Sequence, residues 1–524
     1  MTIFGSFGTF ISGSNVKGLD DTIIDFNDRA TLESFGYKQE LNRELNLFMN
    51  FSFGFSEVSV IASLSAILTY GLMTGGPVII IWGWIITFIF TLIVVLCLAE
   101  ICSAYPTAGG VYSWSGMLVP IKSSTIAAYI CGCSNFIGNA AGDATFAYAF
   151  SDFLNAAINI QGGRNMTKYE IVGLSIGINL LWTILSCFDI GYIGRVNSLA
   201  AILQIIAVAV VFYILLSNSH SINSFDYVFT YYYNDSGWSS PVYVAAIGLL
   251  TSLFSFSAYD ASGHLAEETS NARVNAPLAM IYTVITTGFV GLVYLLGLLF
   301  VFTMSEALHG TTTVASINIF MSITGKLYGS VLSWLIVGTL FLAGLSSVAI
   351  TGRITYAMMR DGVFPHGKYW SEVHEISKSP YRCLLFAFIF NVFLLLLPLI
   401  SQVAFNSIAG ICIIGFNISY AIPLLMKLYY KYDSFPPTPI NLGKYTNYCN
   451  IIAVSWLIIT SIILLLPTRY PITINNMNWS IVILCGISIV LTIYWFVYAK
   501  DNYLGPSRPN LNRNINNSQT RLIH

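Results

Sequence analysis

The chain reads FSFSAYDASG over residues 254–263 and FSFGFSEVSV over residues 51–60, in the middle of long apolar runs. Each stretch combines small and aromatic residues with one carboxylate, Asp260 in the first and Glu57 in the second. A charge at the bilayer centre costs about 2.5–3.5 kcal/mol on insertion scales, so an intramembrane acid usually faces a bundle interior or a watery cavity. The two acids lie at similar places in two halves of the chain. This arrangement predicts two interrupted helices that meet at a binding site near the membrane midplane.

The composition indicates an integral, multi-pass membrane protein. Of the 524 residues, 56% are hydrophobic and 9% are charged, whereas soluble domains carry about 25% charged residues. Twelve apolar runs are each long enough, as helices, to cross a hydrocarbon core about 30 Å thick. We expect these spans at residues 52–72, 78–101, 124–150, 169–188, 197–216, 242–264, 278–303, 328–353, 382–400, 404–426, 449–467 and 480–498. The net charge of −1 gives no basic surface for binding nucleic acid.

We therefore predict an all-α fold of twelve transmembrane helices embedded in the lipid bilayer. A disordered cytosolic tail at residues 1–45 precedes a first repeat at 46–216. A second repeat at 242–426 precedes two accessory helices at 449–498 and a cytosolic tail at 499–524. Because each half holds five spans, the halves lie in opposite orientations and form a five-plus-five inverted repeat, with spans one and six as the broken helices.

The distribution of Lys and Arg predicts that both termini are cytosolic. Nineteen of the 23 basic residues fall on the cytosolic side of this topology, and four fall outside, at Arg164, Lys168, Lys326 and Arg469. Such an excess in short loops sets orientation. The first 45 residues do not have the pattern of a cleaved signal peptide, and no cysteine falls in an external loop, so we expect no disulfide. The sequence does not distinguish the plasma membrane from an endomembrane.

The first broken helix is a candidate site for a substrate carboxylate. Unwinding here would expose main-chain groups, which membrane proteins tolerate only where the backbone lines a cavity. We expect the backbone of Ser56, Val58 and Ser59 to hold the carboxylate, helped by the dipole of the half-helix that follows. Glu57 could bind a cationic group or carry a proton. The alternative is that the small residues permit close helix packing and that Glu57 pairs with a neighbour.

The third span carries a polar stripe. Its members, at intervals of four residues on one helical face, are Cys131, Asn135, Asn139 and Asp143. Asn135 and Asn139 are therefore candidates to line a substrate route, and interhelical hydrogen bonding is the alternative. The chain contains no metal-ligand spacing, phosphate loop or nucleophile motif, so we expect no cofactor and no enzyme activity.

Four motifs, in a consistent order, resemble one transporter family. The sixth span and the loop after it carry Tyr259, Asp260, Ala261, His264, Glu267, Glu268 and Pro277. The other three motifs are Gly75-Gly76-Pro77 with Trp82 and Gly83, Ala99-Glu100-Ile101 with the loop from Tyr105 to Tyr112, and Arg353 with Tyr356, Ala357, Arg360-Asp361-Gly362 and Pro365. Over most of residues 45–500 the chain resembles the amino acid–polyamine–organocation superfamily, in its amino acid/choline transporter branch. This branch includes GABA permeases and plant bidirectional amino-acid transporters.

The resemblance implies a secondary transporter for an amino acid or related amine, such as GABA, held between the unwound first and sixth helices. Phe254 is then expected to be a gate or stacking group over the substrate, and the carbonyls of Ser257 and Ala258 are expected to bind its ammonium group. Asp260 is expected to respond to protons, by symport or by exchange, or else to be a structural partner of Arg353 or of freed backbone N–H groups. His264 is expected to be a hydrogen-bonded structural residue.

The substrate and the functional class leave alternatives. Glu57 stands where this branch usually keeps an apolar or small residue, and an added acid could favour a cationic substrate such as a polyamine or choline. Gly352 stands where a Ser commonly precedes Arg353. The alternative of another class is a non-transporting receptor or sensor, or a channel, and saturable uptake would separate a carrier from these.

Overall fold

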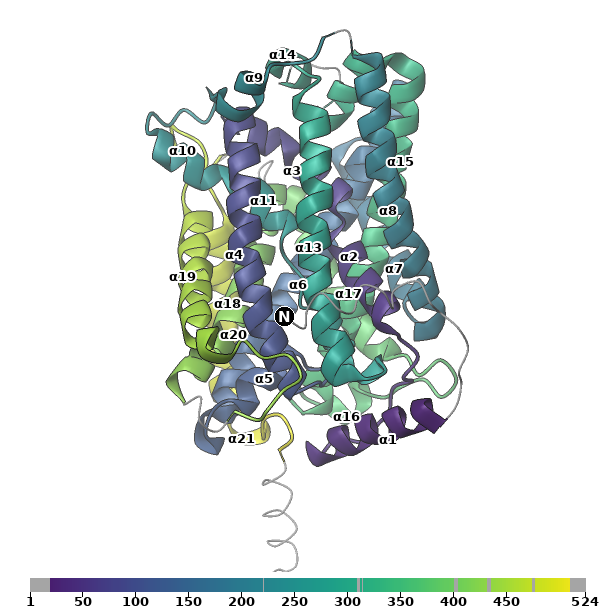
Figure 1. The fold of residues 1–524 in the computed structure, drawn as a ribbon, viewed down its shortest axis with the longest axis vertical. Helices are drawn as coiled ribbons and strands as arrows, with labels where there is room; N and C mark the ends of the chain where they lie inside the picture. The colour runs from purple at the N-terminus through teal and green to yellow at the C-terminus, as the bar shows by residue number, and fades with distance from the viewer. Residues whose placement is uncertain are drawn as a thin grey trace, which may run out of the picture.

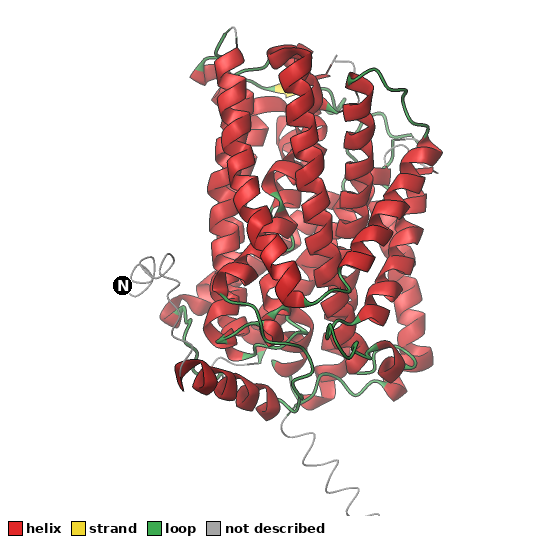
Figure 2. Cartoon of the chain, turned by 90° about the vertical axis from the view of Figure 1, so that its right-hand side faces the viewer, coloured by secondary structure: helices red, strands yellow, loops and turns green. Residues whose placement is uncertain are grey.

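The computed structural model describes residues 19–508, apart from 220, 309–311, 313, 400–403, 431–434 and 474–475. The described chain is a bundle of upright helices whose connecting loops gather mainly at its two ends (Figure 1, Figure 2). Its strands are two residues long, β1 (Thr74–Gly75) pairing antiparallel with β2 (Tyr233–Asn234). The expected all-helical class is confirmed.

Ten helical segments of the described chain are long and apolar enough to cross a membrane. They are α2 (Leu47–Val58) with α3 (Val60–Met73), α4 (Gly76–Ala104), α7 (Lys168–Leu185), α8 (Ile190–Asn218), α13 (Ala272–Leu299), α15 (Ala315–Arg360), α17 (Tyr381–Leu396) with the turn η3 (Leu397–Leu399), α18 (Ala404–Tyr429), η5 (Gly443–Tyr445) with α19 (Thr446–Leu465), and α20 (Ser480–Tyr494) with the π-turn η6 (Trp495–Ala499) and α21 (Lys500–Asn502).

The predicted third and sixth spans are helical but do not belong to these ten segments. The third is α6 (Ile121–Ile160), whose 40 residues are long enough to span but include many small and polar side chains. Other helices bury most of α6, so protein rather than lipid surrounds it. The sixth is divided into α10 (Pro241–Gly248), α11 (Leu250–Ser255) and α12 (Ala261–His264).

Short helices lie at both ends of the bundle (Figure 1). At one end, which we call the α1 end, lie α1 (Leu19–Ser34), α5 (Val111–Met117), α16 (Gly367–Trp370) and α21. At the opposite end, the α9 end, lie α9 (Phe225–Thr230), α10 and α14 (Met304–Leu308). A 3-10 turn, η2 (Ala266–Glu268), follows α12.

The N-terminal segment differs from the expected disordered tail, because residues 19–34 form α1. The carboxylate of Asp28 accepts hydrogen bonds from the backbone N–H groups of Asn271 (2.7 Å) and Ala272 (3.2 Å), at the start of α13. An acid at this position satisfies amide groups that have no partner within their own helix. This long-range cap holds α1 against the bundle. Residues 1–18 and 509–524 of the expected tails lie outside the described chain.

Two helix breaks lie inside the bundle, where the sequence predicts them. Between α2 and α3, Ser59 has φ 38° and ψ 71°, a left-handed conformation that residues other than glycine rarely adopt. Between α11 and α12, residues 256–260 are not in a helix, and Ala258 has φ 60°. Such backbone strain persists only where the surrounding structure fixes it, and it clusters at functional sites.

Helices α6 and α18 are in backbone contact at a pair of glycines. A Cβ atom on Gly415 would lie 2.7 Å from the carbonyl oxygen of Ser134 and 2.8 Å from the Cα atom of Gly138. Only glycine allows this close approach. The contact brings the polar stripe of α6 next to α18.

We predict that Gly415→Ala forces these helices apart and destabilises the protein by about 1–3 kcal/mol, the usual cost of overpacking. Gly486→Ala, in α20, is the matched control, because a Cβ atom there would meet no atom within 4 Å. Thermal unfolding of both purified variants in detergent measures the difference. Equal stability of the two variants would show that the crossing tolerates a side chain.

Candidate functional site

A small cavity lies between the two helix breaks. The volume open to the centre of a water molecule is about 10 Å³, room for about one water molecule. Its lining consists of Glu57, Val58, Asn139, Gly142, Phe146, Phe254, Ser257, Ala258, Ser347, Cys412 and Phe416. The structure therefore brings together six residues predicted for the site: Glu57, Val58, Asn139, Phe254, Ser257 and Ala258.

Two hydrogen-bond acceptors in this lining have no donor. Glu57 is 2% exposed, and its Oε2 atom has no hydrogen-bond partner in the described chain. Asn139 is 1% exposed, and its amide nitrogen donates to the carbonyl oxygen of Asn135 (2.9 Å), while its Oδ1 atom has no partner among the described residues. A buried charge or polar atom without a partner is costly. The cavity is therefore suited to a group that donates hydrogen bonds, above all a cationic one.

The free backbone N–H groups of the first break lie further along the chain than predicted. Ser56 and Val58 are inside α2, where N–H groups bond to carbonyls four residues earlier, and the N–H of Ser59 donates to Phe55 (3.0 Å). The unpaired N–H groups are instead those of residues 60–62, the first turn of α3, which has no side-chain cap. The hydroxyl of Ser56 points toward α8 and donates to the carbonyl of Asn197 (3.4 Å). An anion at the start of α3 would meet the positive end of its dipole.

The second break leaves carbonyl groups with free acceptor capacity. Ser257 and Ala258 line the cavity. The carbonyl of Ser257 accepts no backbone hydrogen bond in the described chain, and that of Ala258 accepts one from the N–H of Ala261 (3.2 Å). An ammonium group near these two residues would find free acceptor lone pairs.

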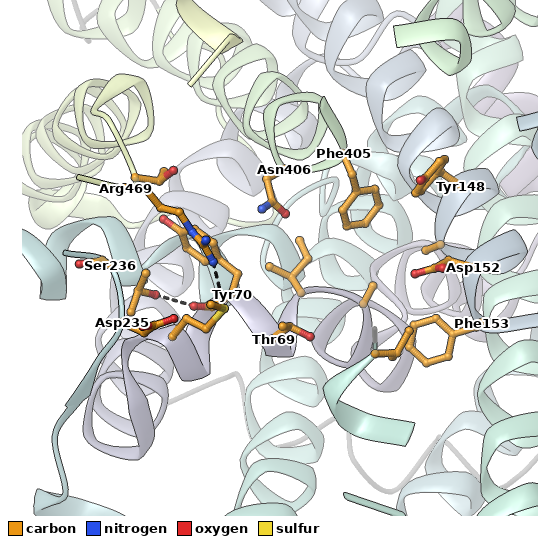
Figure 3. A pocket seen from close by; sticks show the side chains of 17 residues that line it. Thr69, Tyr70, Tyr148, Asp152, Phe153, Asp235, Ser236, Phe405, Asn406 and Arg469 are labelled. Carbon is orange, nitrogen blue, oxygen red and sulfur yellow. Dashed lines mark hydrogen bonds between the residues drawn. The ribbon is translucent and has the colours of Figure 1, made fainter. Parts of the chain in front are cut away.

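A larger cavity lies along α6 beyond the small one. Phe146 and Phe254 line the small cavity, with ring centroids 6.0 Å apart. One helical turn beyond Phe146, α6 lines a cavity of about 240 Å³ toward the α9 end. Figure 3 shows Arg469, Tyr70 and Asp235 on one side of this larger cavity and Tyr148, Asp152 and Phe153 on the other. Phe254 lines the small cavity and is absent from the lining of the larger one.

Buried ion pairs close the opposite side, at the α1 end. Arg353 pairs with Glu268, and Arg360 with Glu267, each at 3.0 Å. Next to Arg360, Asp361 accepts hydrogen bonds from the hydroxyls of Tyr37 and Tyr112 (2.9 Å each), and burial raises the pKa of its carboxyl to about 6. These contacts join the N-terminal segment to α5, η2 and α15. Arg353 is therefore the partner of Glu268 and not of Asp260.

The residues of the polar stripe of α6 have different surroundings. Asn139 lines the cavity, whereas Asn135 donates to Asp260 (2.9 Å) and to the hydroxyl of Ser419 (3.1 Å). Asp143 accepts hydrogen bonds from Ser347 (2.5 Å) and Asn391 (3.0 Å) on neighbouring helices. The packing interpretation thus holds for Asn135 and Asp143.

Asp260 lies beside the cavity without lining it. Its carboxylate is 2% exposed and faces three donors or possible donors: Tyr420 Oη (2.6 Å), Asn135 Nδ2 (2.9 Å) and His264 Nε2 (3.0 Å). These partners come from α18, α6 and α12. The carboxylate therefore connects three parts of the bundle behind the second break.

Sequence reasoning missed five lining residues. They are Gly142, Phe146, Ser347, Cys412 and Phe416. The first two lie three and seven positions after Asn139, on the same helical face, so the stripe itself could have identified them. Within the described residues, no group of three or more His, Cys, Asp or Glu side chains could hold a metal ion.

Comparisons with known proteins place the chain among the amino-acid permeases. A sequence model of the family described as amino acid permease matches residues 45–488. The chain is similar to the amino-acid permease BAT1 of Arabidopsis thaliana, at 31% identity over 93% of this chain and 98% of the relative. An uncharacterized amino-acid permease of Schizosaccharomyces pombe is 30% identical over 94% of this chain and 93% of the relative. The GABA-specific permease of Saccharomyces cerevisiae is 28% identical over 95% of this chain and 88% of the relative.

We predict that Asn139→Cys reacts with hydrophilic methanethiosulfonate reagents faster than Asp143→Cys, because position 139 lines the cavity and position 143 is packed against α15 and α17. Cys412 lines the same cavity and Cys131 lies on the same face of α6, so both must first be replaced by alanine. Mass spectrometry of labelled proteoliposomes gives the two rates. Equal inertness would indicate that the whole stripe serves packing only.

Proposed function

The chain belongs to the amino acid permease family, and from this premise we propose that it is a secondary transporter for an amino acid or related amine that works by alternating access. In this proposal α6 and the divided segment α10–α12 complete twelve spans. Spans one to five and six to ten form an inverted repeat. Both termini are cytosolic, an orientation supported by the excess of Lys and Arg in cytosolic loops.

The observation that carries the proposal is the buried, unpartnered Oε2 atom of Glu57 in a cavity between two broken helices. An intramembrane acid without a protein partner is a functional group by default. A charge here attracts a cation more strongly than it would in water, because the surrounding dielectric constant is low. We therefore propose that Glu57 and the Oδ1 atom of Asn139 bind a positively charged part of the substrate.

The two breaks supply groups for the rest of an amino acid. The carboxylate of the substrate binds at the N–H groups of residues 60–62, which are unpaired in the described chain. The α-ammonium group of the substrate binds at the carbonyls of Ser257 and Ala258. Phe254 covers the substrate. The cavity of about 10 Å³ is too small for any amino acid, so binding requires Phe254 or Phe146 to move.

The two ends of the bundle correspond to two gates. The pairs Arg353–Glu268 and Arg360–Glu267 close the α1 end. The 240 Å³ cavity lies toward the α9 end, and we propose that Phe146 and Phe254, which line the small cavity, form the thin gate between the two. In our proposal this conformation faces outward with its thin gate closed, and the cycle continues by parting of the ion pairs. Asp260 is the group that responds to protons.

Choline is the second candidate substrate. Three phenylalanines, Phe146, Phe254 and Phe416, line the same cavity as Glu57. Aromatic faces beside a carboxylate suit a quaternary ammonium ion, through cation–π attraction. Saturable uptake by proteoliposomes of labelled L-alanine, GABA, L-lysine, spermidine and choline would discriminate these substrates, and non-saturable flux would instead indicate a channel.

We predict that Glu57→Gln lowers uptake of L-lysine more than uptake of L-alanine. A hydrogen bond to a charged group is worth about 1.5–3 kcal/mol, so the ratio of kcat/KM for lysine over alanine should fall by roughly tenfold to a hundredfold. Initial rates in proteoliposomes measure both substrates.

The matched control is Glu375→Gln, which neutralises an exposed acid far from the cavity. It should leave the lysine to alanine ratio unchanged. Equal losses for the two substrates in Glu57→Gln would remove Glu57 from selectivity.

A further inference from the structure

We propose that Asp260 and His264 act as one proton-binding unit, which we call the 260–264 pair, and that its proton links the second helix break to the closed α1 end. The inference rests on the proposed function for its role in transport. It assigns His264 a part in coupling that neither the sequence motif nor the cavity indicates.

The pair is buried and its geometry is well defined. Asp260 is 2% exposed and His264 is 1% exposed. The Nε2 atom of His264 lies 3.0 Å from Oδ2 of Asp260, and its Nδ1 atom lies 3.1 Å from the carbonyl oxygen of Ala108. Both ring nitrogens therefore face oxygen atoms.

Counting protons shows that the pair must hold an additional one. A carbonyl oxygen can only accept a hydrogen bond, so Nδ1 of His264 carries a proton. The contact between Nε2 and Asp260 then needs a second proton, either on the ring or on the carboxyl group. Tyr420 and Asn135 also donate to this carboxylate, which favours the ionised acid beside an imidazolium ring.

Loss of that proton breaks one of two hydrogen bonds. A neutral imidazole has a single N–H group, so His264 can then donate to Asp260 or to the carbonyl of Ala108, but not to both. At the contact that loses its proton, the lone pair of the ring nitrogen would face the lone pairs of an oxygen atom, which is repulsive. The pair is thus a two-state element that holds both partners only when it is protonated.

The loop that carries Ala108 connects the pair to the ion pairs at the α1 end. The N–H of Ala108 donates to Oε1 of Glu267 (2.9 Å), and Glu267 pairs with Arg360 (3.0 Å). The ring of His264 also packs directly on this loop, because a Cβ atom on Gly110 would lie 2.6 Å from its Cε1 atom. Release of the Ala108 carbonyl would therefore loosen the loop that supports Glu267.

Titratable groups surround the pair on several elements. Acidic or neutral titratable groups interact with Asp260 from three elements and from its chain neighbour: Glu57 of α2, Cys131 of α6, Cys412 and Tyr420 of α18, and Tyr259. The arginines of α15, Arg353 and Arg360, are each paired with a glutamate of η2. Arg273 of α13 bonds to the carbonyl of Ser103 (3.3 Å). Glu57 is thus the one other carboxylate among these groups.

The test compares variants that keep one contact of the ring but cannot titrate. His264→Gln places an amide nitrogen near Nε2 and retains the bond to Asp260, and His264→Asn places one near Nδ1 and retains the bond to Ala108. L-Lysine and L-alanine uptake by full-length protein in proteoliposomes is measured from pH 5 to pH 8, together with Asp260→Asn and the double variant Asp260→Asn/His264→Gln. His374→Gln, at an exposed histidine, is the control.

We expect pH-dependent uptake for the wild type and the control. Both His264 variants, Asp260→Asn and the double variant should share one flattened profile, because each removes the same proton. Counterflow of labelled against unlabelled substrate should continue. A wild-type profile in either folded His264 variant, or additive effects in the double variant, would contradict the proposal.

A second measurement does not depend on transport. Because the pair keeps both of its hydrogen bonds only with its extra proton, the melting temperature of the wild type in detergent should fall as pH rises through release of that proton. The variants should lack this step. If the wild type takes up no amino acid or amine, the proposed function fails. The melting measurement still tests the 260–264 pair, because a fall of melting temperature that is unchanged in His264→Gln or Asp260→Asn would contradict it.

Discussion

The structure depends on one constraint: polar groups freed inside a membrane must be bonded to protein or face a ligand. The breaks at Ser59 and at residues 256–260 free backbone N–H and carbonyl groups, and residues next to both breaks line the same cavity. Helices α6, α15 and α18 surround these breaks and contribute residues to the cavity between them. The glycine contact lets α6 and α18 approach closely, so the space that remains between the helices is one small cavity. The position of the site is therefore set by the two points at which the helices are interrupted.

Three carboxylates in this interior differ through their surroundings. Asp143 is bonded to two side chains of neighbouring helices, and Asp260 is surrounded by three. In the described chain, the Oε2 atom of Glu57 has no hydrogen-bond partner. Groups of the same chemistry thereby acquire different tasks, as in active sites where environment separates two acids. The family gives the class of function, and these environments support the structural, proton-binding and substrate-binding roles that we propose for the three acids.

The helix breaks and half of the cavity could be predicted because their signal is local. Small residues and a lone acid at residues 51–60 and 254–263 are visible in the chain itself. The unpaired N–H groups were predicted one turn too early, since the end of α2 depends on the bond from Ser59 to Phe55. The partners of Asp260 lie up to 160 residues away, at Tyr420, and no short pattern reports them. The same is true of the cap that Asp28 provides for α13.

The most direct test of the account is a cryo-electron microscopy structure of the protein in lipid nanodiscs with L-lysine. The account predicts lysine between the two breaks, with its side-chain ammonium group at hydrogen-bond distance from Glu57 and Asn139. Its carboxylate should lie at the first turn of α3, formed by residues 60–62. Lysine confined to the larger cavity beside Asp152 and Arg469, with the site between the breaks unchanged, would contradict it.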